Sequence, residues 1–185
     1  MGINYNDYVV KFSSRFKCVV IDASYVQKIH DFVSKLVLEK RKEKHHTIDS
    51  KNEVKRFLTG FLGEAALEQL LKIKIIDWSI GCSDLYHKPD IPGYRVGIKT
   101  VERNKFPIIF KKNQYPQIIC IKSIDRDDVV FICGLADTNT LNMYQSDDLI
   151  LDRNLRARGT KTGFYGFKYL TVINSLSDLE EYKLD

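Results

Sequence analysis

Cysteine is scarce in this sequence, and its spacing argues against the classes of protein that depend on it. The four cysteines, Cys18, Cys82, Cys120 and Cys133, form no Cys-x-x-Cys pair, and all but Cys82 lie in apolar runs. Cys82 and His87 are five residues apart without a second ligand pair, so the spacing argues against a structural zinc site. Buried free thiols are expected in a reducing compartment, which favours a cytoplasmic protein.

Long apolar runs are also absent. No stretch approaches the roughly 20 residues that a membrane-spanning helix requires. Residues 1–6 contain no signal-peptide core and lack the serine or threonine at position 6 that a myristoylation signal prefers. We therefore expect a cytoplasmic protein without a membrane partner. Neither a glycine-rich phosphate-binding loop with its Lys-Ser or Lys-Thr end nor a serine nucleophile elbow is present.

The composition itself indicates a globular chain with a basic balance. Hydrophobic residues make up 44% of the 185 residues and charged residues 29%, which suffices for a buried core in a single domain. The formal net charge of +5 fits a polyanionic partner such as nucleic acid. We expect one domain over residues 1–185, with an N-terminal hairpin and helix (1–48), a central core (50–135) and a C-terminal basic loop and strand (136–185).

Residue patterns in the first part of the chain predict a hairpin followed by two helices. Apolar residues at 8–12 and 16–21 predict a short N-terminal hairpin. Ser24 is suited to cap a helix that runs to about Lys44. A second helix begins at Ser50 with a capping box, and its apolar stripe extends over roughly five turns.

Strand patterns dominate the rest of the chain. The expected strands are 84–87, 94–101, 107–110, 117–123, 129–135 and 169–172, and a short helix is expected at 177–182. The order of helices followed by strands predicts an α/β (α+β) fold, in which helices flank a central mixed β-sheet.

Three charged residues lie where this arrangement would bring them together. Glu64 lies close to the apolar face of the second helix, where a carboxylate needs a partner, a metal ion or an edge position. Asp90 precedes a turn, and Lys99 ends the strand-like run after it, on the same face as Gly97 because strand side chains alternate. Carboxylates that hold a divalent cation, with an ammonium that stabilises charge on phosphorus, are the groups that metal-dependent phosphodiester hydrolysis requires.

Taken singly, each of these residues also fits an ordinary structural role. Asp90 lies in a segment with good turn chemistry of its own. Lys99 would then be a strand lysine on a solvated face, and Glu64 the exposed shoulder of an amphipathic helix. The order of the three residues along the chain favours the functional interpretation over this one.

This order resembles that of the PD-(D/E)xK nuclease superfamily. The resemblance is carried by Gly63-Glu64, Pro89-Asp90 and the run Val96-Gly97-Ile98-Lys99-Thr100, and it covers the chain from Lys51 to about Leu135. It implies a restriction-endonuclease-like fold. It also implies a metal-dependent endonuclease that hydrolyses DNA with Mg²⁺ or Mn²⁺, of a restriction, repair, defence or mobile-element type, and that acts as a homodimer to cut both strands.

Carried over residue by residue, the resemblance assigns three catalytic roles. Asp90 would be a metal ligand, Lys99 the catalytic lysine near the attacking water, and Glu64 the helix acid that binds the metal directly or through water. The backbone carbonyl of Ile98 would face the same site. Asp84 competes with Asp90 for the ligand role, because it begins the preceding strand.

Gly97 departs from the family pattern, because it stands where a second acid is expected and offers no carboxylate. Two compensations are open: Glu102, three residues past Lys99, supplies the ligand, or Asp84 and Asp90 both do. Without either, the protein is a catalytically inactive nuclease-fold module that binds DNA or another protein. An unrelated α+β interaction protein is a third alternative.

Two basic regions are candidates for contact with a phosphate backbone. The first comprises Lys99, Arg103, Lys105, Lys111 and Lys112. The second comprises Arg153, Arg156, Arg158, Lys161 and Lys168, interleaved with Gly159, Gly163 and Gly166 and with Phe164, Tyr165 and Phe167. A glycine-rich basic loop allows the backbone to approach phosphates, and its aromatic rings either stack on exposed bases or pack inward beneath a polar hairpin.

Overall fold

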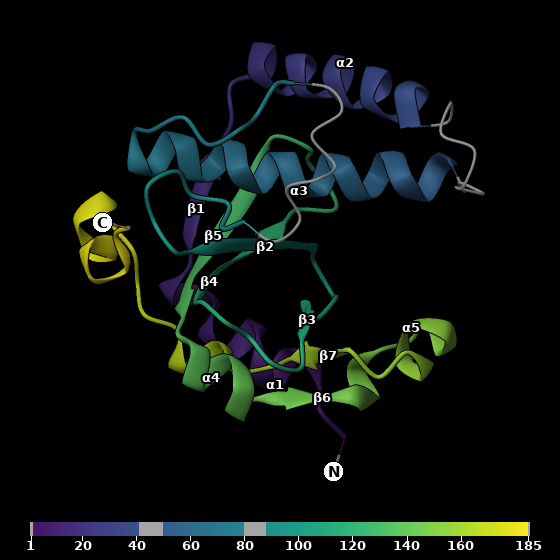
Figure 1. The fold of residues 1–185 in the computed structure, drawn as a ribbon, viewed down its shortest axis with the longest axis vertical. Helices are drawn as coiled ribbons and strands as arrows, with labels where there is room; N and C mark the ends of the chain where they lie inside the picture. Colours follow the sequence, from purple (N-terminus) through teal and green to yellow (C-terminus); the bar gives the residue numbers. More distant parts are fainter. Residues whose placement is uncertain (1, 41–49, 80–87, 185) are drawn as a thin grey trace.

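A computed structural model describes residues 2–40, 50–79 and 88–184, in which two long helices lie over a mixed sheet and a second, smaller sheet lies beneath it (Figure 1). The long helices are α2 (Ala23–Lys40) and α3 (Ser50–Leu71). α2 packs on α3, and α3 packs on the mixed sheet. The predicted α+β class, with helices against a mixed sheet, is therefore confirmed.

The mixed sheet has the strand order β1-β5-β4-β2 within the described residues. β1 and β4 each pair antiparallel with β5, whereas β2 runs parallel to β4 and forms one edge of the described part of the sheet. The strands are β1 (Lys17–Val20), β2 (Gly97–Glu102), β4 (Gln117–Lys122) and β5 (Val129–Ala136). The described parts of the predicted strands in this sheet are thus present, although the predicted strand at 84–87 lies outside the described residues.

Within the described residues the smaller sheet has the strand order β3-β7-β6. Short helices lie before, between and after its strands along the chain. Its strands are β3 (Ile108–Phe110), β6 (Gln145–Ser146) and β7 (Lys161–Phe164). The short helices are α1 (Tyr5–Tyr8), η1 (Val10–Arg15), α4 (Thr138–Met143), η3 (Asp147–Leu149), α5 (Arg153–Ala157), η4 (Phe167–Tyr169) and η5 (Leu176–Tyr182).

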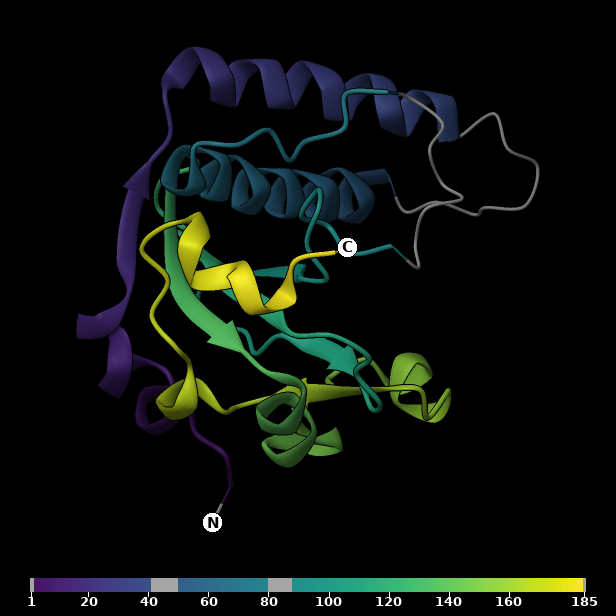
Figure 2. The ribbon, with the colours of Figure 1, turned by 60° about the vertical axis from the view of Figure 1, so that its left-hand side comes forward.

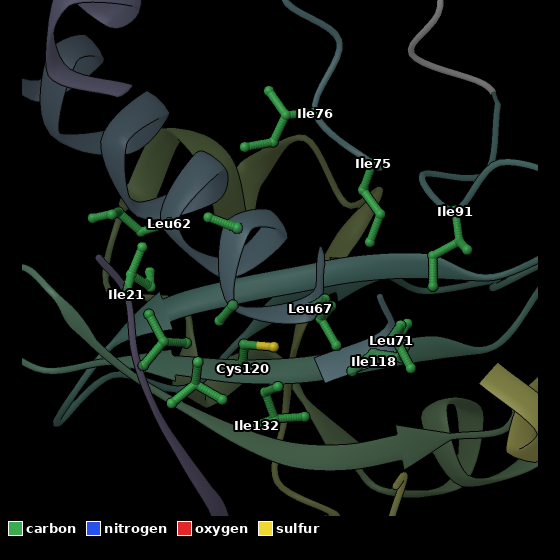
Figure 3. Close-up of a cluster of buried hydrophobic side chains, with 14 of the residues drawn as sticks. Ile21, Leu62, Leu67, Leu71, Ile75, Ile76, Ile91, Ile118, Cys120 and Ile132 are labelled. Atoms are coloured by element: carbon green, nitrogen blue, oxygen red, sulfur yellow. The ribbon is translucent and has the colours of Figure 1, made fainter. Parts of the chain in front are cut away.

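Two hydrophobic cores lie on opposite faces of the mixed sheet. The first lies between the helices and the sheet, where Leu62, Leu67 and Leu71 of α3 meet Ile118, Cys120 and Ile132 (Figure 3). The second joins the other face, including Ile119 and Cys133, to Ile109 and Phe164 of the smaller sheet. This alternation along each strand follows from the period of two of strand side chains. Within the part of the chain described, no helix is both long and apolar enough to cross a membrane.

The prediction of an N-terminal hairpin is wrong. Its first half is helical instead: the Asn4 side chain accepts a hydrogen bond from the Asn6 amide (2.9 Å) and caps α1, which η1 follows. The apolar residues of this stretch serve the second core, in which Val9 is buried. The second half is strand β1, but its partner is β5, which lies far along the chain.

The C-terminal part and the cysteines also differ from expectation. The predicted strand at 169–172 is reduced to one bridge between Thr171 and Leu135, because the 3₁₀ helix η4 takes up its first residue. The predicted basic loop contains helix α5 and strand β7. Cys120 and Cys133 are buried free thiols, as expected, whereas Cys18 is exposed and Cys82 lies outside the described residues.

Helix α3 approaches strand β2 unusually closely at Gly63. A Cβ built on Gly63 would lie 1.7 Å from the Thr100 Oγ1 atom, so no larger residue fits without movement. The Thr100 hydroxyl is buried there, without a hydrogen-bond partner among the described residues. The next residue of the helix is Glu64, so the contact fixes where this carboxylate enters the fold.

We expect Gly63→Ala to lower the free energy of unfolding by about 1–3 kcal/mol, because the added methyl group overpacks the contact between α3 and Thr100. Gly60→Ala is the matched control, since a Cβ at Gly60 meets nothing within 4 Å. That control should raise stability by roughly 0.5–1 kcal/mol through helix propensity alone. Urea denaturation measures both, and equal effects of the two substitutions would contradict the close packing.

Candidate functional site

Asp90 is fastened to the start of strand β2 by a compact loop. The Asp90 carboxylate accepts a hydrogen bond from the Ile98 amide (2.5 Å), and the Asp90 and Ile91 amides donate to the Val96 carbonyl (3.1 and 3.2 Å). Gly93 takes a positive φ of 79° within this loop, as turn geometry requires. The turn expected from the sequence is therefore present, and it holds the carboxylate at the edge strand.

The C-terminal segment supports the same loop from outside. The Arg95 amide donates to the Tyr182 carbonyl (2.7 Å), and the Leu184 amide donates to the Gly93 carbonyl (2.9 Å). Figure 2 shows η5 lying beside the mixed sheet, where Leu179 is buried in the first core. Two separate segments of the chain therefore position Asp90.

Gly97 and Lys99 lie on the face of β2 that looks away from α3. A Cβ built on Gly97 would lie 3.4 Å from the Asp90 Oδ2 atom and only 2.9 Å from the Tyr115 Cε2 atom. Position 97 therefore faces the Asp90 carboxylate. In this chain the Tyr115 ring takes up the adjoining space.

Lys99 and Asp90 influence each other electrostatically. Burial lowers the pKa of Lys99 to about 8, with a further lowering by the charge of Lys161, while Asp90 opposes the shift and Arg56 adds to it. Burial likewise raises the pKa of Asp90, against the Ile98 amide and the Lys99 charge. Asp90 is nevertheless exposed, so neighbouring residues cover some sides of its carboxylate and solvent reaches the others.

Glu64 joins this group from helix α3. Burial raises the pKa of Glu64 to about 8, and the nearby charge of Asp90 is the next largest cause, ahead of Glu68 and Asp77. The charge of Asp90 therefore acts both on Glu64, which lies on a helix, and on Lys99, which lies on a strand. Groups with strongly shifted pKa values concentrate at functional sites, because burial and like charges are costly elsewhere.

Glu102 does not join the group. It lies on the opposite face of β2 from Lys99, is 8% exposed, and forms ion pairs with Lys55 (3.0 Å) and Lys105 (2.7 Å). Although burial opposes it, the hydrogen bonds from these two lysines lower the pKa of Glu102. The expectation that Glu102 supplies the missing metal ligand thus has no support from the geometry. Asp84, the other candidate, lies outside the described residues.

The carboxylate oxygens of Glu64 and Asp90 are of the kind that hard divalent cations bind. Within the described residues no group of three or more His, Cys, Asp or Glu side chains is placed to hold a metal ion, and Asp90 is the acid whose charge acts most strongly on Glu64. Mg²⁺ is commonly held by one or two carboxylates, with waters and substrate phosphates completing its shell. The negative charge of Asp90 raises the pKa of Glu64, and a cation between the two groups would oppose that effect.

The predicted basic residues divide into two groups. Lys105, Lys111 and Arg156 are neutralised by Glu102, Asp147 (2.6 Å) and Asp148 (2.9 Å), respectively. Arg103, Lys112, Arg158 and Lys161 form no ion pair with any described acid, and the first three are exposed.

The aromatic residues of the second basic region settle the alternative left open by the sequence. Phe164 and Phe167 are buried in the second core, and Tyr165 is half-buried. The two phenylalanines therefore pack inward, and they offer no surface on which a base could stack.

Arg56 and Tyr115 were not expected at the site. Arg56 lies two turns before Glu64 on α3, and its charge reaches Lys99. Helical spacing provides a signal for Arg56, because residues four apart follow one side of a helix. Tyr115 arrives through the parallel register of β2 with β4, in which Gly97 stands opposite Gln117. No local pattern in the sequence indicates that register.

No family model matches this chain, and neither a curated protein nor a solved structure similar to it is found. The nuclease resemblance therefore rests on the residues of the sequence alone.

We expect the stability of the protein to fall as the pH rises from about 5 to about 8. The pKa of Glu64 is about 8 in the folded state against an ordinary 4.5, so in this interval the folded protein holds a proton that the unfolded chain has released. Glu64→Gln should remove roughly 1–3 kcal/mol of this decline, after allowance for solvent screening.

Urea denaturation at several pH values measures the effect of Glu64→Gln. The window is separate from that of Lys99, whose lowered pKa acts between about 8 and its ordinary value of 10.5. Parallel pH profiles for the wild type and Glu64→Gln would contradict the account of a carboxyl that is protonated at neutral pH.

Proposed function

We propose that the protein is a metal-dependent endonuclease that hydrolyses phosphodiester bonds in DNA. The observation that carries the proposal is the place of Asp90, which faces position 97 on the strand that carries Lys99 and whose charge acts on both Lys99 and Glu64. The order of these three residues in the sequence resembles that of the PD-(D/E)xK nucleases. A helix packed on a mixed sheet, with the site at edge strand β2, supports a restriction-endonuclease-like fold.

The residues have separate roles in this proposal. Glu64 and Asp90 would hold Mg²⁺ or Mn²⁺, with Asp90 fixed in position by the Ile98 amide. When bound, the cation supplies Lewis-acid polarisation of the phosphoryl group and compensates its charge. Lys99 places an ammonium beside the phosphate, and its pKa of about 8 allows it to move a proton near neutral pH.

The substrate class follows from the charges that remain uncompensated. Arg103, Lys112, Arg158 and Lys161 pair with no described acid, so they are available to phosphates of a nucleic-acid backbone. We further propose a cytoplasmic enzyme of restriction, defence or mobile-element type, for which the buried free thiols Cys120 and Cys133 fit a reducing compartment. A homodimer would bring two such sites to the two strands.

Position 97 favours a second candidate, an inactive nuclease-fold module that binds DNA or a protein. The Tyr115 ring lies 2.9 Å from where a side chain at position 97 would begin, so the chain is adapted to glycine there. A site with two carboxylates holds a cation more weakly than one with three. Under this alternative the basic residues bind the DNA or protein partner. Glu64, Asp90 and Lys99 are then residues of a former active site that no longer cleaves DNA.

Cleavage of supercoiled and linear DNA with Mg²⁺ or Mn²⁺ separates the two candidates. We expect cutting by the wild type, and losses of about 100-fold or more in Lys99→Ala and Asp90→Asn, because each removes a group in contact with the reacting centre. Glu102→Gln should cut within about twofold of the wild type, since its carboxylate lies on the other face of β2. Absence of cutting with every metal, together with salt-sensitive DNA binding, would favour the inactive module.

The double variant Gly97→Asp with Tyr115→Ala tests whether the site is one carboxylate short. Removal of the Tyr115 ring makes room for a side chain that would reach toward Asp90. We expect the affinity for Mn²⁺ to rise by about tenfold, because a third charged oxygen ligand is added. Gly97→Asn with Tyr115→Ala is the uncharged control. Equal affinities for the two variants by calorimetry would show that position 97 does not face the cation.

A further inference from the structure

The outer face of the smaller sheet carries an exposed aromatic ring. The inner face packs into the second core through Ile109 of β3 and Phe164 of β7. Because strand side chains alternate, Phe110 points the other way, and 55% of this residue is exposed. Single exposed apolar residues are common on protein surfaces, so the meaning of this ring depends on the groups around it.

Lys161, the first residue of β7, shares this outer face with Phe110. The two residues stand opposite each other in the antiparallel register of β3 and β7, and paired residues project from the same face of a sheet. The Lys161 Nζ atom lies 5.3 Å from the centre of the Phe110 ring, a distance at which the ring attracts the ammonium. An aromatic surface and a positive charge are therefore in contact on the outside of the sheet.

Two further cations lie where β3 ends and β7 begins. The Lys111 amide donates a hydrogen bond to the Thr160 carbonyl (3.1 Å), which joins the two segments at this point. Lys112 follows in one segment and Arg158 precedes in the other, and both are exposed. Figures 1 and 2 show helix α5, which ends just before Arg158, beyond this end of the smaller sheet. The ring of Phe110 thus lies at a basic end of the sheet.

Acids of the same region do not balance these cations. Residues 108–112 and 147–161 together hold six basic residues against three acids. Two of the acids form ion pairs of 2.6 and 2.9 Å with basic neighbours, and the third caps helix α5. In the described part of the chain no carboxylate lies within ion-pair distance of Lys112, Arg158 or Lys161. The surface is therefore complementary to an anionic ligand.

The segment after Phe110 leads to the candidate site. Tyr115, whose ring approaches position 97, is five residues further along the chain. Five residues span at most about 18 Å when fully extended, so the Phe110 ring and the Tyr115 ring belong to one neighbourhood. A ligand strand of several nucleotides is long enough to touch both.

We propose that Phe110 is a stacking platform for an unpaired base of a nucleic-acid strand, whose phosphates are bound by Lys112, Arg158 and Lys161. Aromatic rings within a cationic surface bind single strands because every base has a π-face and every nucleotide carries a phosphate. An acidic protein segment would match the cations but would leave the ring uncovered, since the face of an aromatic ring carries partial negative charge. That the strand is DNA rests on the proposed function, whereas the platform requires only a base and its phosphates.

Fluorescence anisotropy in EDTA, where no metal-dependent cleavage occurs, measures the binding of two single strands of equal length. One strand carries its bases, and the other is abasic throughout, so it offers the same phosphates alone. We expect Phe110→Ala to weaken binding of the strand with bases by about tenfold and binding of the abasic strand by less than about twofold. Lys161→Ala should weaken the binding of both strands and reduce the salt slope by about 0.7.

Two further variants control for loss of apolar surface. Phe110→Trp should retain the affinity for the strand with bases, because it retains an aromatic face. Leu38→Ala should bind both strands as the wild type does, since Leu38 is exposed to a similar degree (56%) but lies on helix α2. Equal responses of the two strands to Phe110→Ala, or no response of either, would overturn the platform.

A strand of RNA with the same sequence identifies the source of the base. A loss on Phe110→Ala that is confined to DNA supports a DNA platform, and an equal loss with RNA supports a platform for both. Weaker single-strand binding by Phe110→Ala in a protein that never cuts DNA would support the platform and remove the proposed nuclease. Cutting by a protein whose single-strand binding Phe110→Ala leaves unchanged would support the nuclease and overturn the platform.

A second measurement reports on the Phe110 ring itself. The phenylalanine rings are labelled with ¹³C, and the Phe110 signals are identified by their loss in Phe110→Leu. We expect the ring protons to shift upfield when the strand with bases is added in EDTA, because a stacked base shields them, and to stay in place with the abasic strand. Equal shifts with the two strands, or none with either, would overturn the platform.

Discussion

The close contact of helix α3 with strand β2 at Gly63 and Thr100 is the constraint on which the candidate site depends. A side chain at position 63 would overlap Thr100, so glycine lets the helix lie low on the edge of the sheet. Glu64 is the next residue of the helix, and it lies within reach of the charge of Asp90 at the edge of the mixed sheet. Asp90 is in turn held by the Ile98 amide, one residue before Lys99. The backbone approach thus positions Glu64, and the hydrogen bond holds Asp90 beside the strand that carries Lys99.

Charges of the same sign shift the pKa values of two residues of this site, Glu64 and Lys99. The charge of Asp90 raises the pKa of Glu64, and the charges of Lys161 and Arg56 lower the pKa of Lys99. Such arrangements reduce the stability of the folded protein, so they are expected where ligands complete them. A divalent cation would complete the acidic side, and a phosphate the basic side. Phosphodiester hydrolysis uses both together, which is why the two halves support one proposal.

Local patterns in the sequence indicated more of the fold than of the site's surroundings. Apolar periodicity located α2 and α3, and the strand runs located β2 to β5, because these signals act over a few residues. The prediction of a hairpin was wrong because the apolar residues near Val9 pack into a core that they share with the smaller sheet, which lies far along the chain. The approach of Tyr115 to position 97 depends on the register of β2 with β4. The spacing of residues within either segment does not indicate that register.

Paramagnetic broadening by Mn²⁺ tests the central claim, that Glu64 and Asp90 are the ligands of one cation beside Lys99. Substoichiometric Mn²⁺ is added to isotopically labelled protein, and the backbone amide signals are followed by NMR. We expect broadening centred on residues 64, 90 and 97–99, and its loss in Asp90→Asn. Broadening centred instead on Asp147 and Asp148, or on Glu102, or the same pattern in Asp90→Asn, would contradict it.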